Sequence, residues 1–145
     1  MAVLLDTNIL LRVLQPQSPH APIAERALSV LRFRNEELHI TSQNLIEFWA
    51  VATRPVAENG LGFSTDQAIG HLRALRRLFA LLPEVPLQNE WERLATTYGA
   101  YGKNAHDARL GAAMIVHGLS NILTFNGTDF IRYKNISVLD PRTIV

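Results

Sequence analysis

Short apolar runs bounded by polar or turn-forming residues recur along the chain. The first covers residues 2–5 (AVLL), and Asp6-Thr7-Asn8 interrupts it. A run that is apolar at every position is typical of a parallel strand buried on both faces. The same pattern predicts further strands at residues 38–40, 85–87, 121–124 and 136–139.

Apolar residues spaced three and four apart predict helices between these strands. The expected helices cover residues 9–14, 22–35, 42–53, 65–82, 89–98 and 105–117. Ser64 and Gln67 form a capping-box pattern at the start of the longest helix, and Pro83 closes it. Gly118 stands just after the last helix, where a left-handed cap is common.

The alternation of strands and helices predicts a three-layer α/β/α domain around a mainly parallel central sheet. The 145 residues fit one such domain, residues 1–145, and no internal repeat or low-complexity tract divides them. Ligands of such sheets bind beyond the carboxyl ends of the strands. Polar residues at those ends are therefore the first candidates for a functional site.

Four acidic residues stand at positions that this fold would bring together. Asp6 follows the first strand, and Asp129 follows the strand at residues 121–124 after a short turn. Asp107 lies in the first turn of its helix, where the helix dipole stabilises negative charge. Glu47 is the most unusual, because it interrupts the apolar sequence LIEFW inside a helix. We expect all four carboxylates at one edge of the sheet.

Each acid taken alone has a structural explanation, as a turn former, a helix cap or a solvated side chain. Together they would repel one another, and burial would raise their pKa values. A divalent cation removes that penalty, and Mg²⁺ or Mn²⁺ prefers oxygen ligands. The interpretation is a metal site suited to hydrolysis, because a bound metal activates water and steadies charge on phosphoryl oxygens.

The composition narrows the choice further. Cysteine is absent, which excludes a disulfide framework, a thiolate zinc site and a cysteine nucleophile. No apolar run reaches the length of a membrane span, and no basic leader precedes the first strand, so we expect a cytoplasmic protein. The net charge is +1; if metal neutralised the four acids, nine acids would face 14 Lys and Arg. Such a mildly basic body is compatible with a nucleic-acid substrate.

The ordered set of motifs resembles a PIN domain, in particular the VapC-type toxin ribonucleases. The motifs are VLLDTNIL near the start, LIEFW, HDARLGAA, and ILTFNGTDF followed by ISVLDP, and they span nearly the whole chain. The resemblance implies a Mg²⁺- or Mn²⁺-dependent endoribonuclease that hydrolyses RNA phosphodiester bonds. It also implies the toxin role in a type II toxin–antitoxin system, in which a cognate antitoxin holds the enzyme inactive.

Site residues follow from the resemblance position by position. Asp6 and Asp107 match the family's central metal ligands, and Glu47 matches its acidic residue on the intervening helix. Thr124 matches a hydroxyl residue that lines the site, and Asn8 matches the polar residue beside the first acid. We therefore expect Asp6 and Asp107 to hold the principal metal, with Glu47 and Asp129 binding it directly or through water. Glu47 is also the candidate for orienting the attacking water or acting as general base.

The fourth acid leaves two alternatives. Some relatives have an acid at the position of Asn126, whereas this chain has an amide there and its acid at Asp129. Either Asp129 completes the set of catalytic and metal-binding residues, or Asn126 orients metal-bound water and Asp129 supports the loop. We favour a contribution from Asp129.

Further residues are candidates for substrate or partner contact. Arg73, Arg76 and Arg77 fall within one turn of the long helix, and Lys103 precedes the helix that carries Asp107. The apolar residues of the long helix exceed what one small core needs, so we expect an interface with an antitoxin or a second copy as a homodimer. Two alternatives to the toxin remain, a PIN nuclease of RNA processing without an antitoxin and a non-catalytic PIN-like RNA-binding module.

Overall fold

A single sheet of five parallel strands lies at the centre of the computed structural model, which describes residues 1–145. Its strand order is β3-β2-β1-β4-β5, and every pairing is parallel. The predicted mainly parallel sheet is thus parallel throughout. The strands are β1 (Ala2–Leu5), β2 (Glu37–Ile40), β3 (Ala80–Leu81), β4 (Asn121–Leu123) and β5 (Ser137–Leu139).

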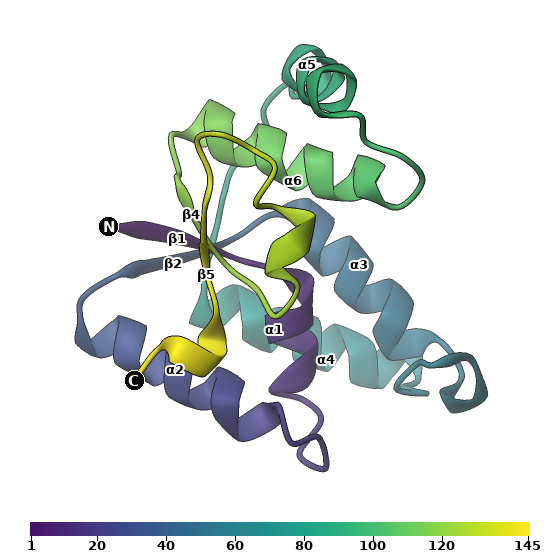
Figure 1. Ribbon diagram of the computed structural model, residues 1–145. Coiled ribbons are helices and arrows are strands. Elements are labelled where there is room, and N and C mark those ends of the chain that lie inside the picture. The colour runs from purple at the N-terminus through teal and green to yellow at the C-terminus, as the bar shows by residue number, and fades with distance from the viewer.

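Six helices form the two outer layers. They are α1 (Thr7–Arg12), α2 (Ala21–Phe33), α3 (Ser42–Thr53), α4 (Thr65–Leu78), α5 (Gln88–Tyr98) and α6 (Asn104–His117). Three short 3-10 helices complete the chain: η1 (Val56–Glu58), η2 (Gly127–Asp129) and η3 (Pro141–Thr143). Helices α5 and α6 lie on one side of the sheet, and α2 and α4 lie on the other (Figure 1). None of the helices combines the length and the apolar character needed to cross a membrane.

Successive apolar side chains of the central strands point alternately into two hydrophobic cores, one on each face of the sheet. Val3 and Leu5 pack into the core shared with α1 to α4, whereas Leu4 packs into the core shared with α5 and α6. Leu123 and Ile122 divide in the same way on β4. Successive side chains of a strand point to opposite faces, so an uninterrupted apolar run is what a doubly covered strand requires.

Polar side chains define where the helices begin. Asp6 caps α1, and its side chain accepts a hydrogen bond from the backbone of Thr7. Thr41 and Asn44 form a capping box at the start of α3. The predicted capping box of Ser64 and Gln67 is confirmed at the start of α4. These bonds satisfy backbone donors that have no partner within the first turn of a helix.

The end of α4 differs from the prediction. The helix stops at Leu78 rather than near residue 82, and Phe79 is already extended, with φ −129° and ψ 148°. The strand predicted at residues 85–87 is absent, and the strand of this region is β3, at Ala80–Leu81. The amide of Leu82 donates to the carbonyl of Ile40 at 2.8 Å. The pairing of this segment with β2 therefore sets the end of α4. The spacing of apolar residues within the helix gives no sign of this pairing.

The strand order places a topological switch point between β1 and β4, at the carboxyl ends of these two central strands. β1 pairs with β2 on one side and with β4 on the other, and Leu5 stands level with Leu123. The chain leaves β1 toward β2 and β3 and returns to β4 on the opposite flank. The residues that directly follow β1 and β4 thus meet at the crevice where ligands of open α/β sheets bind.

Candidate active site

A hollow of about 370 Å³ opens at this switch point of the sheet. All four predicted acids line it: Asp6 after β1, Glu47 on α3, Asp107 in the first turn of α6 and Asp129 in η2. The other lining residues are Thr7, Asn8, Leu11, Val51, Lys103, His106 and Asn126. The fold therefore gathers in one place four carboxylates that lie far apart in the sequence.

Asp6 is held at the bottom of the hollow by hydrogen bonds from both neighbouring segments. Its Oδ1 accepts from the amide of Thr7 at 2.8 Å, and its Oδ2 accepts from the hydroxyl of Thr124 at 2.7 Å. The amide group of Asn8 donates to the same Oδ2 at 3.3 Å and to Oγ1 of Thr124 at 3.2 Å. Asp6 is only 8% exposed, so these bonds fix its direction.

Burial raises the pKa of Asp6 to about 6. The hydrogen bonds from Thr124 and Thr7 act in the opposite direction, because they stabilise the charged carboxylate, and the negative charges of Glu47 and Asp129 raise the pKa again. Near neutral pH the carboxylate is therefore charged, but its burial away from water makes the charged form unfavourable. A cation placed beside it would remove that cost.

The same physics acts on Asp107. Burial raises its pKa to about 7, and the charges of Asp129, Asp6 and Glu47 add to the effect, while Lys103 lowers it. The charges of Glu47 and Asp129 thus act on both Asp6 and Asp107 across the hollow. Perturbed carboxyl groups that share a hollow are a physical indication of a functional site.

Glu47 depends on a residue that sequence reasoning did not single out. The hydroxyl of Thr7 donates to Oε1 of Glu47 at 2.9 Å, and Nδ2 of the fully buried Asn44 donates to that hydroxyl at 3.1 Å. Thr7, the first residue of α1, therefore ties the side chain of Glu47 on α3 to the segment that carries Asp6. Its place directly after Asp6 was the only available signal, and a helix-capping threonine explains that place equally well.

Asn126 and Asp129 both line the hollow, so the structure brings the two alternatives for the fourth position to the same place. The backbone amide of Asn126 donates to Oγ1 of Thr124 at 2.9 Å. The charge of Asp129 is the largest electrostatic contribution to the raised pKa of Asp107. Asp129 therefore lies within electrostatic reach of the central acid, whereas the backbone of Asn126 anchors the loop.

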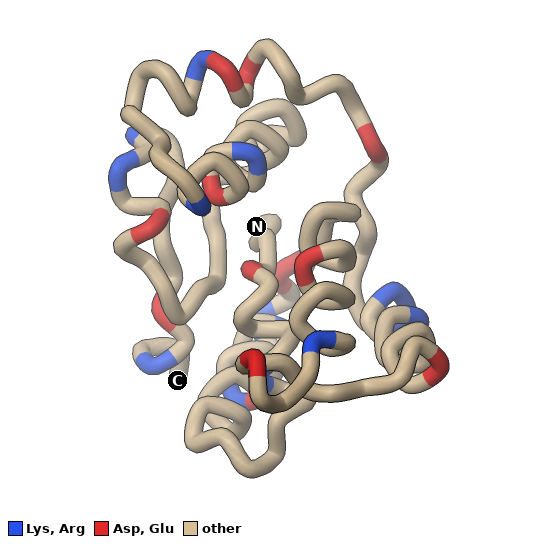
Figure 2. Tube along the Cα trace, turned by 90° about the vertical axis from the view of Figure 1, so that its right-hand side faces the viewer, with Lys and Arg blue, Asp and Glu red and all other residues tan.

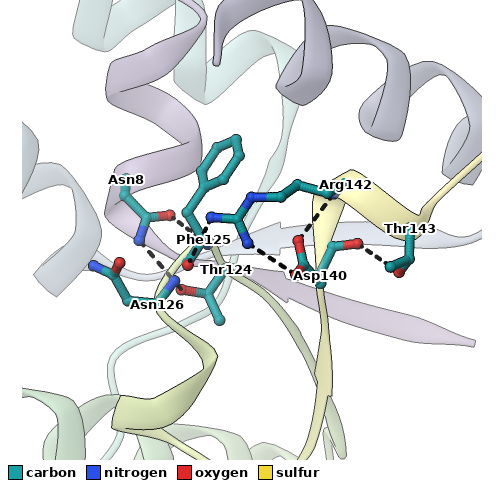
Figure 3. A network of polar contacts seen from close by, with 7 residues as sticks. All are labelled: Asn8, Thr124, Phe125, Asn126, Asp140, Arg142 and Thr143. Atoms are coloured by element: carbon teal, nitrogen blue, oxygen red, sulfur yellow. Dashed lines mark hydrogen bonds and ion pairs between the residues drawn. The ribbon is translucent and has the colours of Figure 1, made fainter. Parts of the chain in front are cut away.

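The loop after β4 is clamped from the C-terminal end of the chain (Figure 3). Arg142 donates to Oδ2 of Asp140 at 2.9 Å and to the carbonyl of Phe125 at 3.5 Å. Its guanidinium carbon also lies 5.5 Å from the centre of the Phe125 ring. On the other side, the amide of Phe125 donates to Oδ1 of Asn8 at 3.3 Å. These contacts hold Thr124, the neighbour of Phe125, against Asp6.

The donor set fits a hard divalent cation. As placed, no three acidic or histidine side chains converge tightly enough to hold an ion by themselves. Mg²⁺ does not require such convergence, because it commonly binds through one or two carboxylates and keeps several waters. The carboxylate oxygens of Asp6 and Asp107, beside those of Glu47 and Asp129 and with no cysteine in the chain, therefore suit Mg²⁺ or Mn²⁺ better than a soft metal.

The candidate contact residues separate into two groups. Lys103 lines the acidic hollow and lowers the pKa of Asp107. Arg73, Arg76 and Arg77 are exposed on α4 and do not line the hollow. Basic positions are spread over several segments of the trace rather than gathered on one (Figure 2). Of the four predicted basic contacts, only Lys103 stands beside the acids.

The profile of the PIN domain family matches residues 3–136, which is most of the chain. The chain belongs to the PIN domain family. PIN domains are in general nucleases, so the acidic hollow at the switch point lies in a fold of nucleases. The predicted three-layer fold and the predicted PIN resemblance are confirmed. No curated protein matches the sequence of this PIN domain.

Several solved structures share the fold over almost their full length. VapBC2 from Rickettsia felis, bound to a DNA fragment from its promoter, matches with a TM-score of 0.73 and 16% identity, over 97% of this chain and 98% of that one. VapBC-1 from nontypeable Haemophilus influenzae matches with a TM-score of 0.69 and 20% identity, over 97% and 98%. FitAcB from Neisseria gonorrhoeae matches with a TM-score of 0.65 and 19% identity, over 96% and 97%.

Proposed function

We propose that this PIN domain is a Mg²⁺- or Mn²⁺-dependent endoribonuclease and the toxin of a type II toxin–antitoxin system. The observation that carries the proposal is the convergence of Asp6, Glu47, Asp107 and Asp129 on one hollow at the carboxyl edge of the sheet. The raised pKa values of Asp6 and Asp107 support it, because four unneutralised acids in one hollow are costly without a cation.

Asp6 and Asp107 would hold the metal, with Glu47 and Asp129 binding it directly or through water. When bound, the ion supplies an activated water and neutralises charge on the phosphoryl group. Thr124 and Asn8 keep Asp6 oriented through their hydrogen bonds to Oδ2. Precise orientation matters, because a small displacement of a ligand reduces its contribution to the reaction.

Glu47 is the general base of the proposed reaction. Thr7 holds one oxygen of its carboxylate, which leaves the other free to accept the proton of the attacking water. The water oxygen bonds to phosphorus, the bond from phosphorus to the 3′ oxygen breaks, and the leaving oxygen takes a proton from solvent water, so that the products carry a 5′-phosphate and a 3′-hydroxyl. Lys103, at the rim of the hollow, would offset the negative charge of the incoming RNA backbone.

The partner in this proposal is a cognate antitoxin. The fold similarity to VapBC structures over nearly the full chain supports it, together with the resemblance of the motifs to VapC-type toxins. An apolar surface on α3 and α4, formed by Leu45, Ile46, Trp49 and Leu72, is available for a partner. Association of two copies into a homodimer stays a prediction.

The experiment is cleavage of a mixed RNA substrate by purified protein with Mn²⁺, with EDTA, and by the Asp6→Asn variant. Asp66→Asn is the matched control, because Asp66 is an exposed acid on α4 outside the hollow. Binding is read separately, as the rise in melting temperature that Mn²⁺ produces. Cleavage and a Mn²⁺ shift in wild type and D66N, both lost in D6N, would support the proposal. A folded wild type that shows neither would overturn it.

A further inference from the structure

A second hollow lies beside the acidic one, between α5 and α6. It has a volume of about 430 Å³ and is lined by Leu87, Gln88, Trp91, Ala105, His106 and Arg109. His106 lines both hollows, so they share a wall at the start of α6. No role in the hydrolysis proposed above falls to this hollow.

Trp91 is fixed in this hollow rather than free to move. The indole Nε1 donates to the carbonyl of Ala105 at 2.8 Å, which ties the side chain of α5 to the first turn of α6. The side chain is only half-buried, so part of the indole remains open to the hollow. A rigid, partly exposed aromatic ring next to a polar cavity offers a stacking surface for a planar ligand.

Arg109 supplies a guanidinium group that forms no ion pair, although it also lines a small neighbouring hollow that contains Glu84. Its Nη1 donates to Oε1 of Gln43 at 3.1 Å, and Nε2 of Gln43 donates in turn to the carbonyl of His106 at 2.8 Å. None of the ion pairs of the chain includes Arg109. Gln43 therefore positions the guanidinium without neutralising it, and most of its N–H donors stay available for a ligand.

We propose that this hollow is a nucleobase subsite, which accepts an unpaired base of the RNA next to the phosphate held in the acidic hollow. Proteins read unpaired RNA bases by stacking them on aromatic side chains or guanidinium groups and by hydrogen bonds to their edges. Trp91 provides the aromatic surface, and Arg109, His106 and Gln88 provide polar groups. Because His106 lines both hollows, a single RNA strand would reach from one to the other across this residue. The inference rests on the proposed function, since it assigns the recognition of the same substrate.

The subsite would make Trp91 and Arg109 specificity residues rather than catalytic residues. They act on substrate binding and leave the acids untouched. Loss of one stacked or hydrogen-bonded base weakens binding by roughly tenfold. We therefore expect Arg109→Gln, and Trp91→Phe to a smaller extent, to raise KM while kcat stays within about twofold. Arg26→Gln is the matched control, because Arg26 is an exposed arginine on α2 and lines neither hollow.

The direct test uses tryptophan fluorescence, because the chain contains only two tryptophans. In the Trp49→Phe variant, Trp91 alone reports. Single-stranded RNA hexamers are titrated with Ca²⁺ present in place of Mn²⁺, and an abasic hexamer of the same length serves as the ligand control. The expected result is quenching of Trp91 by base-bearing hexamers, weak quenching by the abasic hexamer, and roughly tenfold weaker binding in the Arg109→Gln background.

The outcomes separate the subsite from the nuclease. RNA cleavage with unchanged Trp91 fluorescence, or equal quenching by the abasic hexamer, overturns the subsite and leaves the nuclease proposal standing. In the first of these cases the hollow is open to a protein partner instead. Base-dependent quenching without any metal-dependent cleavage supports the subsite and contradicts the nuclease. An equal loss of binding in Arg26→Gln and Arg109→Gln also overturns the subsite, because it indicates a general charge effect.

Discussion

The hydroxyl of Thr124 donates a 2.7 Å hydrogen bond to Oδ2 of Asp6, between residues that follow the neighbouring strands β4 and β1. The same hydroxyl oxygen accepts the backbone amide of Asn126 at 2.9 Å. One fully buried side chain thus orients the central carboxylate and anchors the loop that leads to Asp129. The geometry of the acidic hollow therefore depends on how β1 and β4 are paired.

Replacing Thr124 by valine keeps the shape of the side chain and removes three hydrogen bonds, those with Asp6, Asn126 and Asn8. We expect the pKa of Asp6 to rise further, because the bond from Thr124 lowers it in the native protein. The free energy of unfolding should fall by about 1–3 kcal/mol, the cost of leaving buried polar groups unpaired. Urea denaturation measures the loss, with Thr96→Val on the exposed face of α5 as control. Equal stability of T124V and T96V would contradict the expectation.

The metal-free protein should lose stability as the pH rises from about 4 to 7. Asp6 and Asp107 have raised pKa values in the folded state, to about 6 and about 7, so between pH 4 and 7 the folded protein binds more protons than the unfolded chain. Stability then falls with rising pH. Asp6 alone contributes on the order of 3 kcal/mol across its window. Thermal denaturation in EDTA measures the effect, and a melting temperature that does not fall over this range argues against it.

Replacing Asp107 by asparagine removes one of the repelling charges without changing the size of the side chain. At pH 8 and without metal, D107N should melt at a higher temperature than wild type, because the remaining acids lose a like-charged neighbour. The difference should shrink as the pH falls toward 4, because Asp107 is then protonated in the folded protein and increasingly in the unfolded chain as well. RNA cleavage should be abolished. Cleavage at the wild-type rate in D107N would remove Asp107 from the site.

Mn²⁺ should stabilise the protein more at pH 8 than at pH 5.5. Protons compete with the metal for Asp6 and Asp107, whose pKa values lie in this range. At a fixed Mn²⁺ concentration the rise in melting temperature reports the occupied fraction of the site. The shift is measured at both pH values, with EDTA added to show reversal. Equal shifts at the two pH values would indicate that the metal binds elsewhere.

Asp129 and Asn126 can be distinguished by a pair of variants. If Asp129 completes the site, Asp129→Asn should weaken Mn²⁺ binding by about tenfold or more and lower the pKa of Asp107, because it removes the charge that raises this pKa most. Asn126→Ala should then have a smaller effect, since its backbone amide still donates to Thr124. Isothermal titration with Mn²⁺ measures both. The reverse order would assign the fourth position to Asn126.

Local sequence patterns predicted most of the strands and helices. The apolar run before Asp6 predicted a doubly buried strand, and the capping box of Ser64 and Gln67 predicted the start of α4. Both signals are local, because strand burial and helix capping depend on residues a few positions apart. The end of α4 escaped prediction, because the backbone of Ile40 on β2, far away in the sequence, pairs with the segment after Leu78.

The acidic residues of the hollow can be identified from the sequence, but the side chains that contact them cannot. A reader of the sequence finds Asp6, Glu47, Asp107 and Asp129 and can expect them at one sheet edge, because parallel strands end at a common edge. The role of Thr7 beneath Glu47 and the hollow that Trp91 and Arg109 share beside the acids come from side chains that long-range packing brings together. No spacing along the chain encodes such contacts, because they depend on how α3, α5 and α6 settle around the sheet.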